Sequence, residues 1–315
     1  MPLQSKDILV VTDPAALSTT VSLVLGAGGA RGLAHIGVIR WLLGNGYTIG
    51  SIAGSSMGAL VGGIYAAGKL DAYADWVVSL ERREIRQLLD WAFGRSGLIK
   101  GERIMGALRE LVGEHRIEDL PVSYTAVAMD IASGKEVWLR KGSLFDAIRA
   151  SIAIPLVVTP FLDGERRLID GGVVNPVPIA PTLNDTTDMT VAVSLGGRAM
   201  PGGGRAQVVP PDASPEMAPG YRERIRDFIG GLMGGTSNEP AAPGMVSIAL
   251  ASMESMQNTI ARLKLAAYSP DVMVEIPRNA CGFGEFWRAA EMIALGEEIT
   301  ARAFARAGRA AGGAQ

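Results

Sequence analysis

A serine at the centre of a short glycine motif is the first candidate for chemistry. Residues 54–58 read Gly-Ser-Ser-Met-Gly, which places Ser56 at the centre of a G-x-S-x-G pattern. Where this pattern joins a strand to a helix, its small residues permit the sharp turn that exposes a nucleophilic serine. The preceding "YTIGSIAGSS" reads as a strand and the following "MGALVGGIYAAG" as a helix. We therefore predict that Ser56 is a nucleophile, with Gly54 and Gly58 relieving the crowding around it.

A nucleophilic serine needs a base, and the chain contains only two histidines, His35 and His115. His35 falls one turn into a buried helix and His115 in a polar helix end, so neither is a convincing base. The order Ser56, His115, Asp170 remains formally possible. Asp170 can also act alone, because it follows a short apolar run and directly precedes two glycines. Burial beside a serine would raise the pKa of Asp170, although the same aspartate could simply stabilise its own turn.

A glycine-rich turn follows the first apolar run of the chain. Residues 26–32 read Gly-Ala-Gly-Gly-Ala-Arg-Gly. At a helix N-terminus such a turn can direct free backbone N–H groups at an oxyanion, and a tight turn without function is the alternative. The dinucleotide-binding spacing fails, because Arg31 stands where its last glycine should be. The chain also offers no His, Cys and carboxylate cluster at metal-ligand spacing, so we predict neither a metal nor another cofactor.

The elements that must position these residues alternate between strands and helices. Short apolar strands recur at "VSLVL", "MTVAVSL" and "DVMVEIP", and helical patterns lie between them. This alternation predicts an α/β fold with a mostly parallel central sheet flanked by helices. Both glycine turns fall at strand-to-helix junctions, so we expect them side by side at the carboxyl edge of the sheet. "SLFDAIRASIAIP" is expected to form a helix capped by Ser143.

The chain is expected to form one main domain with an insertion. Its predicted parts are an N-terminal extension (1–19), a catalytic core (20–195), a Gly/Pro-rich insertion (196–244), helices and a strand that complete the same domain (245–309), and a tail (310–315). Inside the insertion, residues 221–233 carry an apolar stripe at helical spacing. Two alternatives are open for this segment, namely packing against the body and peripheral contact with a membrane.

The composition is that of a globular protein with a substantial core. Of 315 residues, 48% are hydrophobic and 20% are charged, and the net charge is −2. Binding to nucleic acid would call for a clustered basic face, so we expect no such partner. The single Cys281 forms no internal disulfide, and neither a signal peptide nor a run of about 18 apolar residues is present. We therefore expect a cytoplasmic protein, while the composition leaves its oligomeric state open.

Together the motifs resemble those of the patatin-like phospholipase family. In chain order the matching segments are "GAGGARG", "GSSMG" and "DGG", and "GLAHIGVI", "SIAIPLVVTPF" and "GGVVNPVP" are similar to the bacterial branch. The resemblance covers residues 20–195 strongly and the C-terminal third more loosely. It implies a patatin-like three-layer sandwich. The insertion at 196–244 has no counterpart in the pattern, and Ala27 replaces a common loop glycine, so its backbone is expected not to need positive φ.

The resemblance also implies roles for individual residues. Ser56 would be the nucleophile and Asp170 its base in a Ser-Asp dyad, without a histidine. The N–H groups of Gly28 and Gly29 would form the oxyanion hole, with Arg31 organising or supporting it. The remaining motif residues would support these turns: Gly26, Gly32, Gly54, Gly58, Gly171 and Gly172.

The implied activity is hydrolysis of lipid esters, of a phospholipid or a lysophospholipid, through an acyl-enzyme. Two alternatives are left open. A lipid acyltransferase would use the same acyl-enzyme with an acceptor other than water. A lipid-binding or regulatory protein would keep the motifs without catalysis.

Overall fold

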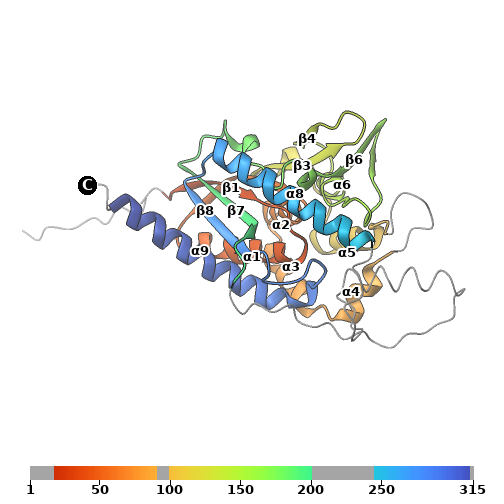
Figure 1. The fold of residues 1–315 in the computed structure, drawn as a ribbon, viewed down its shortest axis with the longest axis horizontal. Coiled ribbons are helices and arrows are strands. Elements are labelled where there is room, and N and C mark those ends of the chain that lie inside the picture. Colours follow the sequence, from red (N-terminus) through yellow and green to blue (C-terminus); the bar gives the residue numbers. More distant parts are fainter. Residues whose placement is uncertain (1–17, 91–98, 201–244, 313–315) are drawn as a thin grey trace, which may run out of the picture.

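The computed structural model of the chain describes residues 18–90, 99–200 and 245–312, and the amphipathic segment predicted at 221–233 lies outside them. The described chain forms an eight-stranded sheet with flanking helices (Figure 1). Its strands are β1 (Thr20–Leu25), β2 (Thr48–Ser55), β3 (Ser123–Asp130), β4 (Glu136–Leu139), β5 (Phe161–Asp163), β6 (Arg166–Asp170), β7 (Met189–Gly197) and β8 (Val272–Pro277). Its α-helices are α1 (Ala34–Gly44), α2 (Met57–Ala66), α3 (Leu70–Ser79), α4 (Arg82–Leu88), α5 (Glu102–Val112), α6 (Leu144–Ser151), α8 (Met245–Ala267) and α9 (Ala289–Gly312).

The sheet is mostly parallel, as the alternation of strands and helices predicts. Neighbouring strands follow the order β5-β6-β3-β2-β1-β7-β8, and β4 pairs with β3 outside this path. Five neighbouring strands run parallel, namely β3, β2, β1, β7 and β8. The other three, β4, β5 and β6, form antiparallel pairs. Because β1 and β2 are parallel neighbours, the turns that follow them leave the sheet at the same edge.

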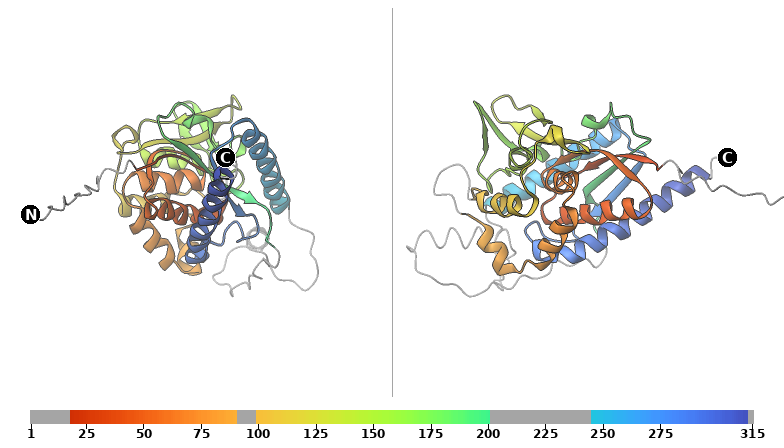
Figure 2. Two further views of the ribbon diagram at one scale, coloured as in Figure 1. Left: turned by 90° about the vertical axis from the view of Figure 1, so that its left-hand side faces the viewer. Right: turned by 180° about the vertical axis from the view of Figure 1, so that it is seen from behind.

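Side chains of β1 alternate between the two faces of the sheet, as expected for a strand. Val21, Leu23 and Leu25 belong to the main core cluster, which also receives side chains of α1, α2 and α9. Val24 belongs to a smaller cluster on the opposite face, together with Ala261 of α8. Figure 2 shows α8 on the side of the sheet away from α1 and α9. The described chain is therefore a three-layer sandwich with one thick and one thin helical layer.

Local signals in the sequence predict several of these elements correctly. Ser143 caps α6, and its Oγ accepts the Asp146 N–H at 3.3 Å. Gly134, in the turn between β3 and β4, has a φ of 67°. The sequence does not single out α4 or the β5–β6 hairpin, because elements this short carry little periodic pattern. Helix α9 continues to Gly312, inside the segment expected as a tail.

Candidate active site

Strand register brings Ser56 and Asp170 to one place. Ser55, the last residue of β2, pairs with Val127 on β3, and the next residue of β3, Ala128, pairs with Asp170 on β6. Because β6 runs antiparallel to β3, its last residue ends beside the turn that leaves β2. The residues that the sequence predicts as nucleophile and base thus meet across three neighbouring strands.

Ser56 occupies a sharp turn between β2 and α2, with a φ of 54° and a ψ of −123°. Positive φ is uncommon for a residue that has a Cβ, and it persists where the surroundings overdetermine it. One such constraint is the hydrogen bond from the Ser56 N–H to Ser151 Oγ at 2.9 Å. Another is Gly58, where an added Cβ would lie 2.0 Å from the Leu25 carbonyl oxygen. The turn that presents Ser56 is therefore held by β1 and α6.

Asp170 is 3% exposed and lies beside the Ser56 side chain, which lowers its pKa. Its Oδ1 accepts the Gly172 N–H at 2.7 Å. Burial raises the pKa of Asp170 to about 7, against the lowering effects of the Ser56 side chain and the Gly172 N–H. A carboxyl group with this pKa can both take and return a proton near neutral pH.

The glycine-rich loop between β1 and the 3₁₀ helix η1 (Gly29–Leu33) presents two free backbone donors. The N–H groups of Gly28 and Gly29 donate to no acceptor within the described residues. By contrast, the N–H groups of Ala27 and Ala30 donate to backbone carbonyls at 2.9 Å. Two adjacent amides without an acceptor, at the start of a helical turn, are suited to bind an oxyanion. Ala27 does not have positive φ, as predicted.

Close packing explains the remaining glycines of the three motifs. At each one an added Cβ would approach another atom to between 2.0 and 2.7 Å, far inside van der Waals contact. These positions are Gly26, Gly28, Gly32, Gly54, Gly58, Gly171 and Gly172. A Cβ at Gly26, Gly54, Gly58 or Gly171 would meet backbone atoms first, and one at the other three would meet side chains, so these turns leave no room for a larger residue.

The Arg31 side chain holds the glycine loop in place through hydrogen bonds. Its side chain is 5% exposed and donates three hydrogen bonds, from Nε to the Gly28 carbonyl at 3.2 Å, from Nη1 to the Arg278 carbonyl at 2.6 Å, and from Nη2 to Glu254 at 2.6 Å. The planar guanidinium suits this fork of acceptors. Arg31 thereby fixes the carbonyl that adjoins the two free amides, and it connects them to β8 and α8.

Neither histidine contacts the Ser56 and Asp170 pair in the described part of the chain. The buried His35 Nε2 lies 2.9 Å from the Gly26 carbonyl oxygen and therefore donates to it. Burial lowers the pKa of His35 to about 4, although the hydrogen bond to Gly26 opposes this shift. His35 is thus a neutral support of the glycine loop. His115 lies beside the Val112 carbonyl at the end of α5, with 3.2 Å between Nε2 and the oxygen.

Three further residues of the site were not recognised from the sequence. Ser151 Oγ accepts the Ser56 N–H and donates to the Val127 carbonyl at 2.6 Å. The Asn175 carbonyl accepts from Ser55 Oγ at 2.7 Å. Glu254 pairs with Arg31 from α8. The available signal for Ser151 and Asn175 was a polar residue inside the apolar runs "RASIAIP" and "GGVVNPVP"; Glu254 left no such signal.

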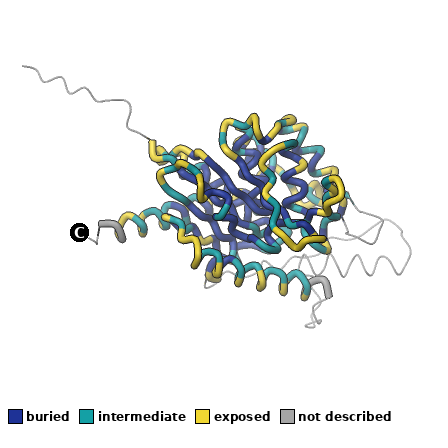
Figure 3. The backbone as a smooth tube through the Cα atoms, turned by 90° about the horizontal axis from the view of Figure 1, so that it is seen from above, coloured by how far each residue is buried: buried dark blue, intermediate teal, exposed yellow. Residues whose placement is uncertain are grey.

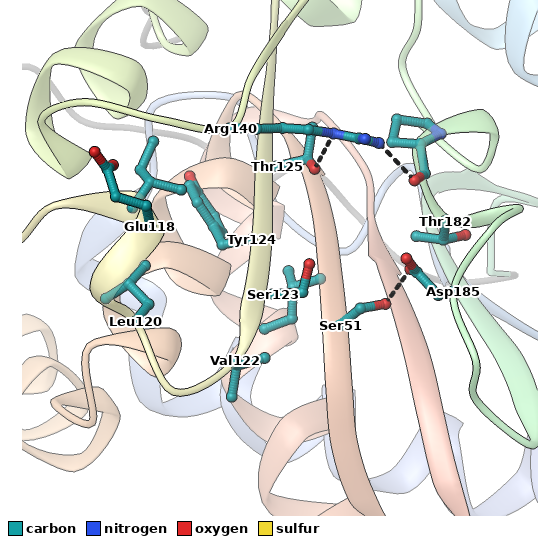
Figure 4. A pocket seen from close by; sticks show the side chains of 13 residues that line it. Ser51, Glu118, Leu120, Val122, Ser123, Tyr124, Thr125, Arg140, Thr182 and Asp185 are labelled. Carbon is teal, nitrogen blue, oxygen red and sulfur yellow. Dashed lines mark hydrogen bonds between the residues drawn. The ribbon is translucent and has the colours of Figure 1, made fainter.

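Two cavities differ in their relation to this site. A space of about 20 Å³ lies between the glycine loop and α8, lined by Gly28, Arg31 and Gln257 among others. It is about the size of one water molecule. A larger cavity of about 210 Å³ lies at the opposite, amino edge of β2 and β3 (Figure 4). Arg140, which donates to Thr125 Oγ1, lines this cavity. Ser56 is not among the lining residues, so the cavity is separate from the serine.

Two further findings concern the described residues alone. They contain no group of three or more His, Cys, Asp or Glu side chains that could hold a metal ion. None of their helices combines the length and the apolar character needed to cross a bilayer.

The sequence of this chain is similar to those of known proteins. Residues 23–183 match the family model described as patatin-like phospholipase. An uncharacterised NTE family protein of Mycobacterium tuberculosis is 38% identical over 346 aligned residues, covering 92% of this chain and 94% of that protein. A lysophospholipase of Kluyveromyces lactis is 32% identical over 184 residues, covering 56% of this chain and 12% of that protein.

The solved structure of VipD from Legionella pneumophila matches with a TM-score of 0.46 and 13% identity, covering 90% of this chain and 66% of that one. The family model spans more than half of the 315 residues, and the mycobacterial relative is similar over almost its whole length. This chain therefore belongs to the patatin-like phospholipase family.

Proposed function

We propose that the protein is a serine acyl hydrolase that cleaves lipid esters with a Ser-Asp dyad. Membership of the patatin-like phospholipase family supports lipid acyl hydrolase activity. One observation carries the proposal of a dyad. The buried Asp170, with its pKa raised to about 7, lies beside the Ser56 side chain, and neither histidine does.

The proposed reaction has two halves. Ser56 Oγ attacks the ester carbonyl carbon while its proton passes to Asp170. The N–H groups of Gly28 and Gly29 stabilise the negative oxygen of the tetrahedral intermediate, and Arg31 keeps that loop in place. Asp170 then returns the proton to the leaving alcohol oxygen as the carbon–oxygen bond breaks, which leaves an acyl-enzyme. Water attacks the acyl-enzyme with Asp170 as base, and the fatty acid and free Ser56 are released.

The proposed substrate is a phospholipid or a lysophospholipid. A similarity to the Kluyveromyces lactis lysophospholipase supports this class. The proposed location is cytoplasmic, with peripheral membrane contact. We further propose that residues 20–195 form the catalytic core and that residues 245–309 complete the same domain. The proposed membrane contact involves residues 221–233.

A covalent probe and product analysis test the function together. A fluorophosphonate should add to wild-type protein once, at Ser56, and mass spectrometry of the intact protein should show no adduct on Ser56→Ala. Asp170→Asn should stay folded but lose turnover. His115→Ala should retain turnover, because its ring contacts only the end of α5. Products should be identified over phospholipids, lysophospholipids and simple esters.

The outcomes discriminate between the possible functions. Labelled protein that releases fatty acid from a lipid ester fits a hydrolase. A transesterified product, formed when lysolipid or alcohol acceptors are supplied, would favour an acyltransferase. Wild-type protein that resists the probe would favour a lipid-binding role. Normal turnover of Asp170→Asn would exclude the dyad, and total loss in a folded His115→Ala variant would restore a triad.

A further inference from the structure

Helix α8 has an unusual exposed surface, which we call its outer face: the exposed residues from Ile248 to Ala267. Ile248, Met256 and Leu263 are 52%, 59% and 68% exposed. At about 100° per residue these three positions lie on one side of the helix. Arg262 carries the single charge of the outer face, and its other residues are alanine, serine or threonine. The outer face therefore has three large apolar side chains and no carboxylate.

The opposite side of α8 is attached to the body by few contacts. Figure 3 shows the tube of α8 mostly in the colours of half-buried and exposed residues. Ala261 is the one described residue of α8 that is buried. Two ion pairs add to this contact, Glu254 with Arg31 at 2.6 Å and Lys264 with Glu136 at 3.0 Å. The one carboxylate of α8, Glu254, is thus paired with Arg31, although its side chain is 43% exposed.

This inward side lies directly on the candidate active site. Besides the Glu254 ion pair with Arg31, Gln257 Nε2 lies 3.2 Å from the position that a Cβ of Gly172 would take, beside Asp170. A cavity of only about 20 Å³ lies between α8 and the glycine loop. The outer face is therefore the far side of a helix whose inner side adjoins the candidate oxyanion-binding loop.

Two exposed arginines, Arg198 and Arg278, lie near the glycine loop. Arg198 follows β7 and Arg278 follows β8, and these segments are joined by the hydrogen bond from the Arg278 N–H to the Gly197 carbonyl at 3.1 Å. The side chain of neither arginine forms an ion pair or hydrogen bond within the described residues. Arg31 Nη1 donates to the Arg278 carbonyl, which places this pair of arginines next to the glycine loop.

We propose that the outer face of α8, with Arg198 and Arg278 beside it, docks onto an anionic lipid surface. The inference rests on the proposed function only in taking a lipid ester as the substrate. Apolar side chains on one face of a helix enter the boundary between headgroups and acyl chains. Arginines without a carboxylate partner among the described residues attract anionic headgroups. The outer face of α8 itself carries no carboxylate, and Glu275 of β8 is the exposed carboxylate near the two arginines. Docking in this orientation places the membrane against α8, whose inward side adjoins the glycine loop.

Vesicle flotation tests the proposal without relying on turnover. The protein would carry Ser56→Ala, and the vesicles would be phosphatidylcholine with or without phosphatidylglycerol. Met256→Glu with Leu263→Glu should lower partitioning onto the mixed vesicles at least about tenfold, since two apolar groups are lost from the interface. Arg198→Gln with Arg278→Gln should lower the preference for phosphatidylglycerol by about fivefold per charge. Leu183→Glu is the matched control, because Leu183 is 56% exposed and flanks the cavity at the amino edge.

The result is decisive in either direction. Strong binding of the parent and the Leu183→Glu control, with loss in the Met256→Glu/Leu263→Glu variant, supports docking through α8. Equal binding of all variants, or no binding of the parent, overturns it. A dimer that dissociates in the same double variant would show that a second copy covers this face, which also overturns it. Hydrolysis of a soluble short-chain ester by the Ser56 protein tests the proposed function separately.

Discussion

At the scale of single residues, the site depends on the environment of one carboxyl group. Burial favours the neutral form of Asp170, whereas the neighbouring Ser56 side chain and the hydrogen bond from the Gly172 N–H favour the charged form. The balance leaves the pKa near neutrality, where a carboxylate is a far stronger base than an exposed aspartate. His35, which could have been taken for the base, is neutral and holds the Gly26 carbonyl instead.

The pH dependence of hydrolysis should follow the titration of Asp170. Its carboxyl must be ionised to accept the Ser56 proton, so kcat/KM should rise as pH rises through about 7 and then level off. Below that midpoint the rate should fall about tenfold per pH unit. The measurement is kcat/KM for a soluble ester. A flat profile from about pH 5 to about pH 8, as a base with an ordinary carboxyl pKa of ~4 would give, would contradict this.

The raised pKa also has a consequence for stability. The pKa of Asp170 is about 7 in the folded protein, whereas the ordinary pKa of an aspartate is 3.8, so the folded state binds the proton more tightly. Its contribution is therefore fully present below about pH 4 and is lost as pH rises through about 7. Asp170→Asn removes the cost of a buried charge while retaining an oxygen for the Gly172 N–H.

Asp170→Asn should accordingly be more stable than wild type by up to a few kcal/mol at about pH 8. The two proteins should converge at about pH 4, where the carboxyl is protonated in both states. Urea unfolding at both pH values provides the measurement. A variant less stable than wild type at about pH 8 would show that the negative charge of Asp170 supports the fold.

At the scale of elements, the site is an arrangement of turns packed against one another. The glycine loop follows β1, the serine turn follows β2, and η3 (Gly171–Val173) follows β6. Gly58, in the first turn of α2, touches the end of β1. Backbone contact of this kind sets the distance between the free amides and Ser56 more rigidly than side-chain packing can.

Gly58→Ala should therefore separate these two turns. The new Cβ would lie 2.0 Å from the Leu25 carbonyl, which forces α2 away from β1. We expect a loss of ~1–3 kcal/mol in stability, as for other overpacked cores, together with reduced fluorophosphonate labelling. Thermal unfolding and probe kinetics measure the two effects.

Gly106→Ala is the matched control for that change. Gly106 lies inside α5, and nothing stands within 4 Å of the position its Cβ would take. Alanine there should stabilise the protein by ~0.5–1 kcal/mol through its better helix propensity, and labelling should not change. Unaltered labelling of Gly58→Ala would show that the contact between α2 and β1 does not position the serine.

At the scale of the whole molecule, the two faces of the sheet are unequal. One face carries the main core with α1, α2 and α9, and the other is covered in part by α8 (Figure 2). The carboxyl edge, where the three turns meet, adjoins the thin layer. Such an arrangement keeps the three turns on a rigid support and covers the other side of the glycine loop with α8, a helix that has little buried surface.

Much of the fold was predictable because its signals are local. Apolar runs bounded by glycine turns identify β1 and β2, and the hydroxyl of Ser143 identifies the start of α6. The candidate site was predictable in part for the same reason, since both glycine turns and the Asp170 turn are continuous segments. Ser151 and Glu254 were not, because they reach Ser56 and Arg31 across 95 and 223 residues of chain.

The sequence by itself determined the residue types and the turns that present them: a serine and an aspartate in glycine turns, and a glycine loop with an arginine. Turn geometry depends on a few adjacent residues, so it can be read from them. Tertiary structure decided the rest. Pairing of β6 with β3 places Asp170 beside Ser56, burial raises its pKa, and the ion pair with Glu254 brings α8 over the loop. These properties arise from contacts between distant segments and from exclusion of water, neither of which any short stretch of sequence contains.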